Sequence, residues 1–572
     1  MNRRKFVTMG AASACLLPLA GAASYLPVYG PQAPPGKPGW LLQLIKLNDG
    51  DLKGMSALKI ADPKHALYGG YQSVVEIPNP VSTCGYIFRA CAAIATPESV
   101  YYQSKAVLNN ISIALQSLLK MQHSDGTIDL LETNFHSPPD TAFMVKRLMQ
   151  AYNIFMQADI PGKETAKPFF EQFLKRAGEA LITGGIHTPN HRWVVSAALT
   201  KLNERWPDPR YINRINDWLA EKIDLDADGQ YTEKSTYGYS AVVDRVLITV
   251  AKGVNKPELL DAVRKNLLMM RYYLHPNGEV VTEASSRQDK GQVGTMENYY
   301  YACRFMALID NDGEMAAMCR IIENTSLPKL TDTMNYFLED PSLWKELPGS
   351  KPLPVSYVKS FPFSGVVRIR RNQWDATILA NNPGWFTFHK TNAVLQAMRI
   401  AASFFGKGQF QAETVEQVGD KWVLTRKLEG PYFQPFPKDK IPGDGDMAKM
   451  PKSQRQQSNV QYLETIVTIS EANNGISVDI DVKGTDGVPV SMELVFRPGG
   501  IFNGVQAHHT EKDAWLFSGE KGGYTVNGNT LQFGPGKMLH KGIHLRGALP
   551  PMDAPTVYLT GFTPFKHTIF LS

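Results

Sequence analysis

The stretch LEDPSLWKELPGSKPLPVSY, residues 338–357, separates two parts of the sequence that differ in hydrophobic period. Proline fixes φ and lacks a backbone donor, so a proline-rich run of this kind interrupts helices and strands alike. Before it, apolar residues recur every three to four positions, and after it they alternate with polar ones. We therefore predict a linker at 338–357 between a helical domain and a β domain.

The predicted helical domain covers residues 95–337. Leu108, Ile111, Leu115 and Leu118 fall on one helical face, as the buried side of a helix requires. The same spacing recurs in the segments 141–157, 163–182, 191–205, 209–222 and 257–273 and in the stripe Val243, Val246, Leu247, Val250 and Val254.

Three polar breaks between these helices are similar to one another: MQHSDGTI (121–128), DLDADGQY (224–231) and LHPNGEV (274–280). Each contains Asp-Gly or Asn-Gly, which favours a tight turn with positive φ. Helical hairpins joined by similar turns indicate a repetitive helical array, either an open solenoid or an (α/α) toroid with a central cleft.

The predicted β domain covers residues 358–572. ISVDIDV (476–482) alternates strictly between apolar and polar residues, and WFTFH and YLETIVTIS are rich in strand-forming residues. Frequent turn signals between such runs predict an antiparallel β-sandwich. The segment 429–454 has too much proline and glycine for a core, so we expect a surface loop there that could cover a cleft.

The N-terminus has the features of an export signal. Residues 1–22 combine a basic start, an apolar middle and a small-residue end, and Arg3-Arg4 points to the twin-arginine route. The mature protein would then be periplasmic or secreted, with residues 23–94 as an N-terminal extension. Cleavage removes three basic residues and no acid, so the formal net charge of +6 would fall to +3.

The composition restricts the classes of partner. With 43% hydrophobic and 20% charged residues the chain is of the globular type. No uncharged apolar run reaches the roughly 20 residues of a membrane-spanning helix. We find no phosphate-binding loop and no dinucleotide fingerprint, and we expect neither a nucleic-acid partner nor a metal. The oligomeric state is left open.

Polar side chains gather at helix starts and turns of the helical domain, where the rim of a toroid would lie. Apart from their acids, these clusters supply amides, imidazoles, phenols and guanidinium groups. A glycoside hydrolase instead needs two opposed carboxylates. The candidate residues are Asn134, His136, Asn190, His191, Arg192, Tyr237, Tyr239 and Arg287.

These residue types suit β-elimination at a uronic acid. The C5 proton next to an ionised carboxylate is hard to remove, so Asn, Arg or His donors must neutralise that carboxylate and stabilise the developing charge. A Tyr or His then takes the proton, and a Tyr can protonate the leaving oxygen. The expected partner is an acidic plant or extracellular polysaccharide or oligosaccharide.

The layout resembles the heparinase II/III-type polysaccharide lyases, which combine a helical toroid with an antiparallel β domain. Asn190-His191 at a helix start, followed by DGQY and Tyr-Gly-Tyr, carries the resemblance. It implies that His191, Tyr239 or Tyr237 is catalytic, that Asn190 and Arg287 bind the substrate carboxylate, and that the β domain contributes a histidine. The best candidate for that histidine is His389 in WFTFHKTN.

The departure from that family is TEKSTYGYS, where the heparinases are richer in glycine, which leaves the tyrosine and the substrate open. Among lyases of this layout, the family that cleaves rhamnose from glucuronate on plant glycans (polysaccharide lyase family 27) is the nearest in general likeness. The remaining predicted substrate-binding residues are Asn134, His136 and Arg192.

Three alternatives stay open from the sequence. A hydrolase could use a carboxylate pair drawn from Asp140, Glu233, Asp228 and Glu283. A glycan-binding protein could hold sugar in the same toroid without reaction. Asp224, Asp226 and Asp228 match the first half of a calcium loop, but the twelfth position is Ser235 rather than Glu, and an Asx turn explains the same residues.

Overall fold

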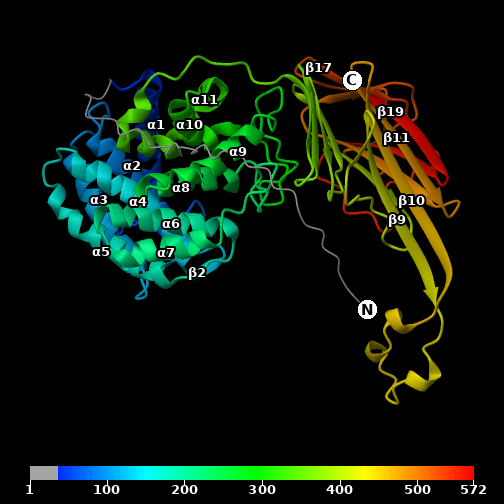
Figure 1. Cartoon of the computed structure of the whole chain (residues 1–572), viewed down its shortest axis with the longest axis horizontal. Coiled ribbons are helices and arrows are strands. Elements are labelled where there is room, and N and C mark those ends of the chain that lie inside the picture. Colours follow the sequence, from blue (N-terminus) through cyan, green and yellow to red (C-terminus); the bar gives the residue numbers. More distant parts are fainter. Residues whose placement is uncertain (1–35) are drawn as a thin grey trace, which may run out of the picture.

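Two rings of helices build the N-terminal domain of the computed structural model, which describes residues 36–572 (Figure 1). The predicted export signal lies outside these residues. Helices of even number contact one another in sequence and form the inner ring, and the odd-numbered helices pack outside them. The inner helices are α2 (Pro80–Ala95), α4 (Pro138–Gln157), α6 (Pro189–Arg205), α8 (Tyr239–Gly253) and α10 (Tyr300–Asp310). The outer helices are α3 (Lys105–Met121), α5 (Lys167–Thr183), α7 (Pro209–Ala220), α9 (Leu260–Met270) and α11 (Gly313–Ser326).

The side chains of the inner ring are more buried than those of the outer ring. The inner helix α6 buries every residue from Asn190 to Thr200, whereas the outer helix α7 buries only Tyr211, Ile215 and Trp218. A helix that is buried all round belongs to the interior of a large core, and one with a single apolar stripe lies on its surface. The predicted (α/α) arrangement is confirmed.

The helical domain begins earlier than the sequence indicated. Helix α1 (Gly39–Met55) contacts α2 and α12 (Met334–Glu339), and its Leu41, Leu44 and Ile45 belong to the same core as the later helices. The segment from residue 39 onward is therefore part of the domain rather than an extension. Glycine and aspartate inside α1 weaken its helix propensity, which tertiary packing overrides.

The three similar breaks fold into one repeated turn. Each turn has the same two backbone hydrogen bonds. The carbonyl of its first residue accepts from the N–H of a glycine three positions later, and the N–H of that first residue donates to the carbonyl four positions later. The first residues are His123, Asp226 and His275. Gly126, Gly229 and Gly278 all have positive φ, as predicted. A Cβ at Gly229 would lie 2.6 Å from the Lys265 carbonyl, so glycine is also required by the close approach of α9.

The C-terminal domain is a sandwich of two sheets, in which almost every neighbouring pair is antiparallel. Within residues 36–572 one sheet has nine strands and the other eight, and their facing apolar side chains form a second core. The first sheet runs β14 (Gln506–Ala507), β15 (Ala514–Leu516), β18 (Thr556–Phe562), β12 (Pro489–Phe496), β7 (Ala393–Ala402), β6 (Phe386–Lys390), β5 (Trp374–Leu379), β4 (Val366–Arg371) and β3 (Ser356–Phe361). The second runs β13 (Ile501–Asn503), β16 (Gly522–Val526), β17 (Asn529–Gly534), β19 (Phe565–Leu571), β11 (Gly475–Gly484), β10 (Gln457–Ala472), β9 (Lys421–Phe433) and β8 (Glu416–Val418).

The helical domain has one small sheet of its own. Strands β1 (Ile128–Leu130) and β2 (Asn134–Ser137) pair only with each other, so the two domains share no sheet. Among the described residues, no helix is long and apolar enough to cross a membrane.

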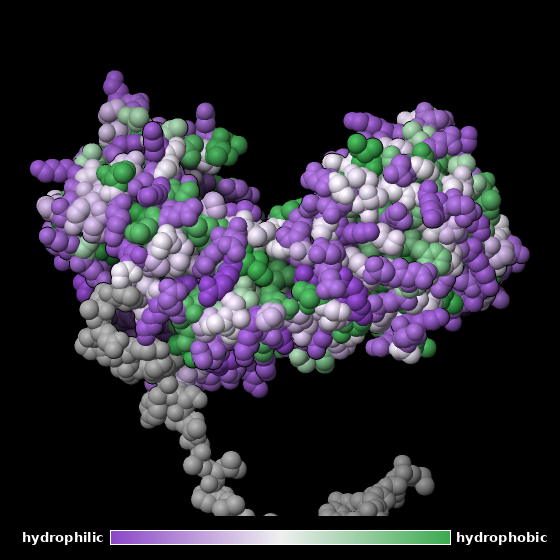
Figure 2. All heavy atoms as spheres, turned by 90° about the horizontal axis from the view of Figure 1, so that it is seen from above, coloured by the Kyte–Doolittle hydropathy of each residue, from purple (hydrophilic) through white to green (hydrophobic). Residues whose placement is uncertain are grey.

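The nine-stranded sheet meets the helical domain along β3, β4 and β5. The Tyr357 hydroxyl and the Arg368 guanidinium both donate to the Tyr272 carbonyl, and Ser364 N–H donates to Asp228. Figure 2 shows the two domains as separate lobes with a deep notch between them. The predicted loop 429–454 extends from the tip of β9 and β10, away from the helical domain (Figure 1), so it does not cover that notch.

Candidate active site

A cluster of polar side chains lies at the rim of the inner helical ring, where α6 and α8 begin. We call Asn190, His191, Glu233, Tyr239 and Arg287 the rim cluster. Pro189 opens α6 and puts the first two of these residues in its first turn. Tyr239 is the first residue of α8, and its N–H donates to the Ser235 hydroxyl at 2.9 Å.

Glu233 links the parts of the rim cluster. The Asn190 amide nitrogen donates to Glu233 Oε2 at 2.5 Å, and Arg287 Nε lies 3.7 Å from Glu233 Oε1. The Arg287 guanidinium stands over the Tyr239 ring, 5.3 Å from its centre. Residues from four separate segments thus form one continuous row, which brings together the predicted Asn190, Tyr239 and Arg287.

His191 is a neutral imidazole in this setting. Burial first, and then the neighbouring His187 and Arg287, lower its pKa to about 4 against the opposing effect of Asp140. Its Nδ1 is buried and has no hydrogen-bond partner among residues 36–572. A neutral ring with a free nitrogen can accept a proton.

The two tyrosines have different surroundings. The Tyr237 hydroxyl donates to Glu297 Oε1 at 2.8 Å, and burial together with Glu297 raises its pKa to about 12. The Tyr239 hydroxyl makes no hydrogen bond to any described residue. Tyr239 therefore offers a free acid–base group at the rim, and Tyr237 does not.

Three predicted substrate-binding residues lie elsewhere. Asn134 donates to Asp140 at 2.9 Å, beside the rim cluster. His136 of β2 is exposed, pairs with Asp125 at 2.7 Å and stacks on His123 of the preceding turn, so it does not join the rim cluster. Arg192 points away as well, because it comes two residues after Asn190 and therefore lies on the other side of α6 from it.

Arg192 is held by a structural network. It pairs with Glu221 at 3.0 Å and with Asp224 at 2.8 Å, and its guanidinium lies over the Trp193 ring. Its charge is neutralised by these carboxylates, which leaves little for a substrate. The substrate-binding prediction for Arg192 is not supported by this placement.

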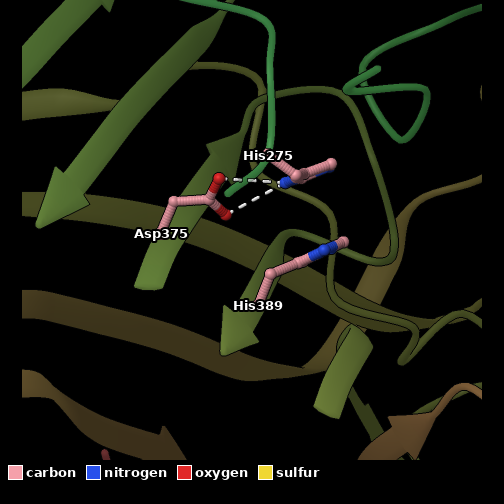
Figure 3. Close-up of side chains that lie close together, drawn as sticks. All are labelled: His275, Asp375 and His389. Atoms are coloured by element: carbon pink, nitrogen blue, oxygen red, sulfur yellow. Dashed lines mark hydrogen bonds and ion pairs between the residues drawn. The ribbon is translucent and has the colours of Figure 1, made fainter. Parts of the chain in front are cut away.

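His389 belongs to a second cluster, between the domains, and not to the rim cluster. His275, Glu283, Arg368, Asp375 and His389 form this interdomain cluster. Figure 3 shows the ring of His275 facing the Asp375 carboxylate, with the His389 ring stacked beside it. The ring centres are 3.6 Å apart, and the planes are within 4° of parallel.

Charges in the interdomain cluster compensate one another. Burial alone would lower the pKa of His275, but Asp375 at 3.0 Å and Glu283 at 3.4 Å raise it to about 9. Burial and the neighbouring His275 cation lower the pKa of His389 to about 3. Arg368 pairs with Asp375 at 2.7 Å, and both side chains are fully buried.

The same cluster contains the one group among residues 36–572 that could hold a metal ion. Ligand atoms of His275, Asp375 and His389 all lie within 4.8 Å of one another. Imidazole and carboxylate are ligands that zinc accepts. Both nitrogens of His275, however, already face carboxylates, and an imidazolium has no lone pair for a metal. As placed, these residues form an ion-pair network.

The predicted calcium alternative has no support in the loop 224–231. Asp224 accepts from Arg192 and Trp193, and Asp226 accepts two backbone N–H groups of its own turn. Asp228 accepts from Ser364 of the β domain. The three carboxylates therefore serve different partners, and the Asx turn is the interpretation that the structure supports.

The carboxylates of the hydrolase alternative are also engaged. Asp140 accepts from Ser137 and Asn134, and Glu233 accepts from Asn190. Glu283 accepts from Thr377 and Thr387 across the domain boundary. None of these groups forms a free opposed pair in the described part of the chain.

Comparisons with known proteins agree with this fold. No protein-family model and no curated protein matches the sequence. The chain is similar to the chondroitin AC lyase of Streptomyces coelicolor, solved with chondroitin sulphate, with a TM-score of 0.55 and 13% identity over 93% of this chain and 79% of that one. This chain shares its fold.

Two further polysaccharide lyases are similar in structure to this chain. For Paenibacillus xanthan lyase the TM-score is 0.56 at 9% identity, over 93% of this chain and 56% of that one. For a chondroitinase AC lyase solved with oligosaccharides the TM-score is 0.52 at 9% identity, over 93% and 82%. The toroid followed by an antiparallel β domain is thus the architecture of this chain.

Proposed function

We propose that this protein is an exported polysaccharide lyase that cleaves a glycosidic bond at O4 of a glucuronate-type uronic acid by β-elimination. The observation that carries the proposal is the free hydroxyl of Tyr239, whose ring lies under the Arg287 guanidinium, together with the neutral His191, whose pKa the same guanidinium helps to lower. Their position on the fold of polysaccharide lyases supports it.

The substrate carboxylate would bind between Arg287 and Asn190. Arg287 is only partly compensated by Glu233, so its charge is available to a substrate anion. Asn190 Oδ1 is buried and has no donor among the described residues, and the proton of a neutralised carboxyl group would supply one. The Arg287 contact strengthens as negative charge develops on the carboxyl group, which lowers the barrier to removal of the C5 proton.

The elimination itself needs one base and one acid. The C5–H bond breaks as His191 takes the proton, the C4=C5 double bond forms, and the C4–O4 bond breaks. The Tyr239 hydroxyl gives its proton to the leaving O4. A proton then returns from His191 to Tyr239, directly or through water, so neither an oxidant nor a cofactor is consumed.

The test distinguishes elimination from hydrolysis. The protein is incubated in ¹⁸O-labelled water with glucuronate glycans, beginning with a rhamnose–glucuronate oligosaccharide and continuing with chondroitin, heparan sulfate and xanthan. Elimination produces ultraviolet absorbance from the double bond and no label in the products. Hydrolysis would put one ¹⁸O into each new reducing end without absorbance, and a binding protein would leave the glycan intact.

A further inference from the structure

A cavity of about 400 Å³ lies inside the inner helical ring, next to the rim cluster. Its wall begins at Asp140 and Phe143 of α4, and the Phe143 ring meets the His191 ring edge-on at 6.2 Å. Glu297, the acceptor of the Tyr237 hydroxyl, also lines it. The cavity is therefore adjacent to the proposed catalytic groups.

The cavity is deep, and an ion pair separates its far end from a second cavity. Its α4 lining runs from Asp140 to Gln150, which at 1.5 Å per residue is about 15 Å. At the far end Arg147 pairs with Asp332 at 3.1 Å, and Asp332 also pairs with Arg89 at 2.7 Å. These three residues also line a second cavity, so their ion pairs separate the two spaces.

Two cations in the wall form no ion pair with a described residue, although Asp140, Glu297 and Asp332 also line the cavity. Lys146 is 8% exposed, and its ammonium makes no hydrogen bond or ion pair with any described residue, only a contact with the Phe143 ring at 5.9 Å. Arg245 of α8 also lacks an ion pair within residues 36–572, and its buried Nε has no acceptor. Burial lowers the pKa of Lys146, and Arg245 and Arg147 lower it further.

Neutral donors surround the same space. Gln150 Nε2 and the Tyr336 hydroxyl line the cavity, are buried and have no partner in the described part of the chain. Buried donors are normally satisfied, and an unpaired buried cation such as Lys146, with the half-buried Arg245 beside it, is costly. The wall thus presents an ammonium, a guanidinium, an amide and a phenol that all lack an acceptor, which is the donor set of an oxyanion site.

We propose that this cavity is a second anion-binding subsite, in which Lys146 and Arg245 hold a carboxylate or sulfate group on a sugar neighbouring the cleaved uronate. The proposal rests on the proposed function only for the identity of the glycan. The Arg147–Asp332 pair lies between this cavity and the second one, so the cavity suits the end of a chain better than its middle. The part that enters is therefore an acidic chain end, and the substrate carries acidic groups on more than one sugar.

The experiment measures binding without turnover, in the Tyr239→Phe background. The ligands are a tetrasaccharide of 1,4-linked glucuronate and its carboxyl-reduced form. Lys146→Met and Arg245→Gln should each weaken binding of the acidic tetrasaccharide about 10- to 100-fold, the usual worth of a hydrogen bond to a charged group. Lys175→Met, an exposed lysine of the outer helix α5, is the matched control and should change nothing.

Folding and ligand source are checked separately. Without ligand, Lys146→Met should raise the thermal unfolding midpoint, since it removes an uncompensated buried charge. Inorganic sulfate should raise the midpoint of the parent protein more than that of the Lys146→Met variant. If the protein cleaves no uronate but sulfate still gives this difference, the subsite stands and the proposed function falls.

Two results would overturn the subsite. One is that Lys146→Met and Arg245→Gln, both folded, bind the acidic tetrasaccharide as tightly as the parent. The other is that they lose affinity equally for the carboxyl-reduced form, because the cavity would then recognise shape rather than charge. A lack of response to both sulfate and the tetrasaccharide counts against it in the same way.

Discussion

The rim cluster and the interdomain cluster use similar residue types in opposite ways. In the interdomain cluster His275 lies between two carboxylates, and Arg368 pairs with Asp375. In the rim cluster the Tyr239 hydroxyl, His191 Nδ1 and Asn190 Oδ1 have no partners among residues 36–572. In the first arrangement the charges are paired with one another and His389 Nδ1 is the atom left without a hydrogen-bond partner among the described residues, whereas in the second all three of these side chains have an atom without one.

The difference separates a structural role from a catalytic one. A compensated buried network fixes the position of two domains, because its charges are already paired with one another. Unsatisfied buried polar groups are rare in folded proteins, and where they gather they indicate that something else completes them. We therefore expect changes in the interdomain cluster to affect stability and changes in the rim cluster to affect turnover.

The largest effect is expected for Tyr239→Phe. The variant loses one hydroxyl and little volume, so elimination should slow about 10²- to 10⁴-fold while stability falls by about 1 kcal/mol at most. Rates are followed by ultraviolet absorbance, and stability by denaturant unfolding. Tyr237→Phe is the control and should stay active, because the Tyr237 hydroxyl already donates its hydrogen bond to Glu297. Full activity of both variants would remove tyrosine from the mechanism.

Sequence reasoning located the rim cluster better than the interdomain cluster. Asn190, His191 and Tyr239 stand at helix starts, and helix starts of an inner ring meet at one rim, so local pattern was sufficient. His389 was misplaced because its surroundings depend on how the β domain docks. His275 gave no signal of its own, since it lies in an ordinary turn.

Other residues were missed for reasons of packing. Glu233 was considered only as a hydrolase carboxylate, although it connects Asn190 to Arg287. Lys146 occupies a core-facing position of α4, between Ala142 and Met149, and a charge on an apolar stripe was the signal that could have revealed the cavity. The hydrophobic period, by contrast, predicted the change of fold at 338–357 from the sequence alone.

The second-largest effect is expected in the interdomain cluster, on the free energy of unfolding. Asp375→Asn leaves Arg368 and His275 without their shared counter-charge, so the free energy of unfolding should fall by about 3–5 kcal/mol. Turnover per folded molecule should change far less than in Tyr239→Phe. Glu279→Gln, which breaks the less buried interdomain pair with Arg497, is the control and should cost about 1 kcal/mol or less. Equal losses in both variants would contradict the special role of the buried network.

The pH dependence should differ between the clusters. His191 has a folded pKa of about 4, below the unfolded value of about 6.5, so its contribution to stability is present above 6.5 and is lost as the pH falls through 4. His275, with a folded pKa of about 9, contributes stability that is complete below 6.5 and is lost as the pH rises through 9.

Activity should follow His191 on the acid side. Its protonation removes the base, so the elimination rate should decline as the pH falls through about 4. A pH–rate profile is the measurement, with unfolding monitored in parallel to separate loss of rate from loss of structure. An acid limb near 6.5 would mean that His191 is not buried in the working enzyme.

The smallest effect is expected for Arg192→Lys. Lysine keeps the charge but cannot bridge Glu221 and Asp224 with one planar fork, so stability should fall by about 1 kcal/mol. The kcat and KM for any cleaved glycan should stay unchanged, because the side chain points away from the rim cluster. A marked rise in KM would restore Arg192 to the substrate site.

The central claim is that the rim cluster performs elimination, and the labelled-water digestion of a glucuronate glycan tests it most directly. The predicted result is ultraviolet absorbance that rises with each cut and products without ¹⁸O, with the rise slowed about 10²- to 10⁴-fold in Tyr239→Phe. Products that carry ¹⁸O and lack the double bond would contradict it, because water rather than the Tyr239 proton and the His191 base would then have cleaved the chain.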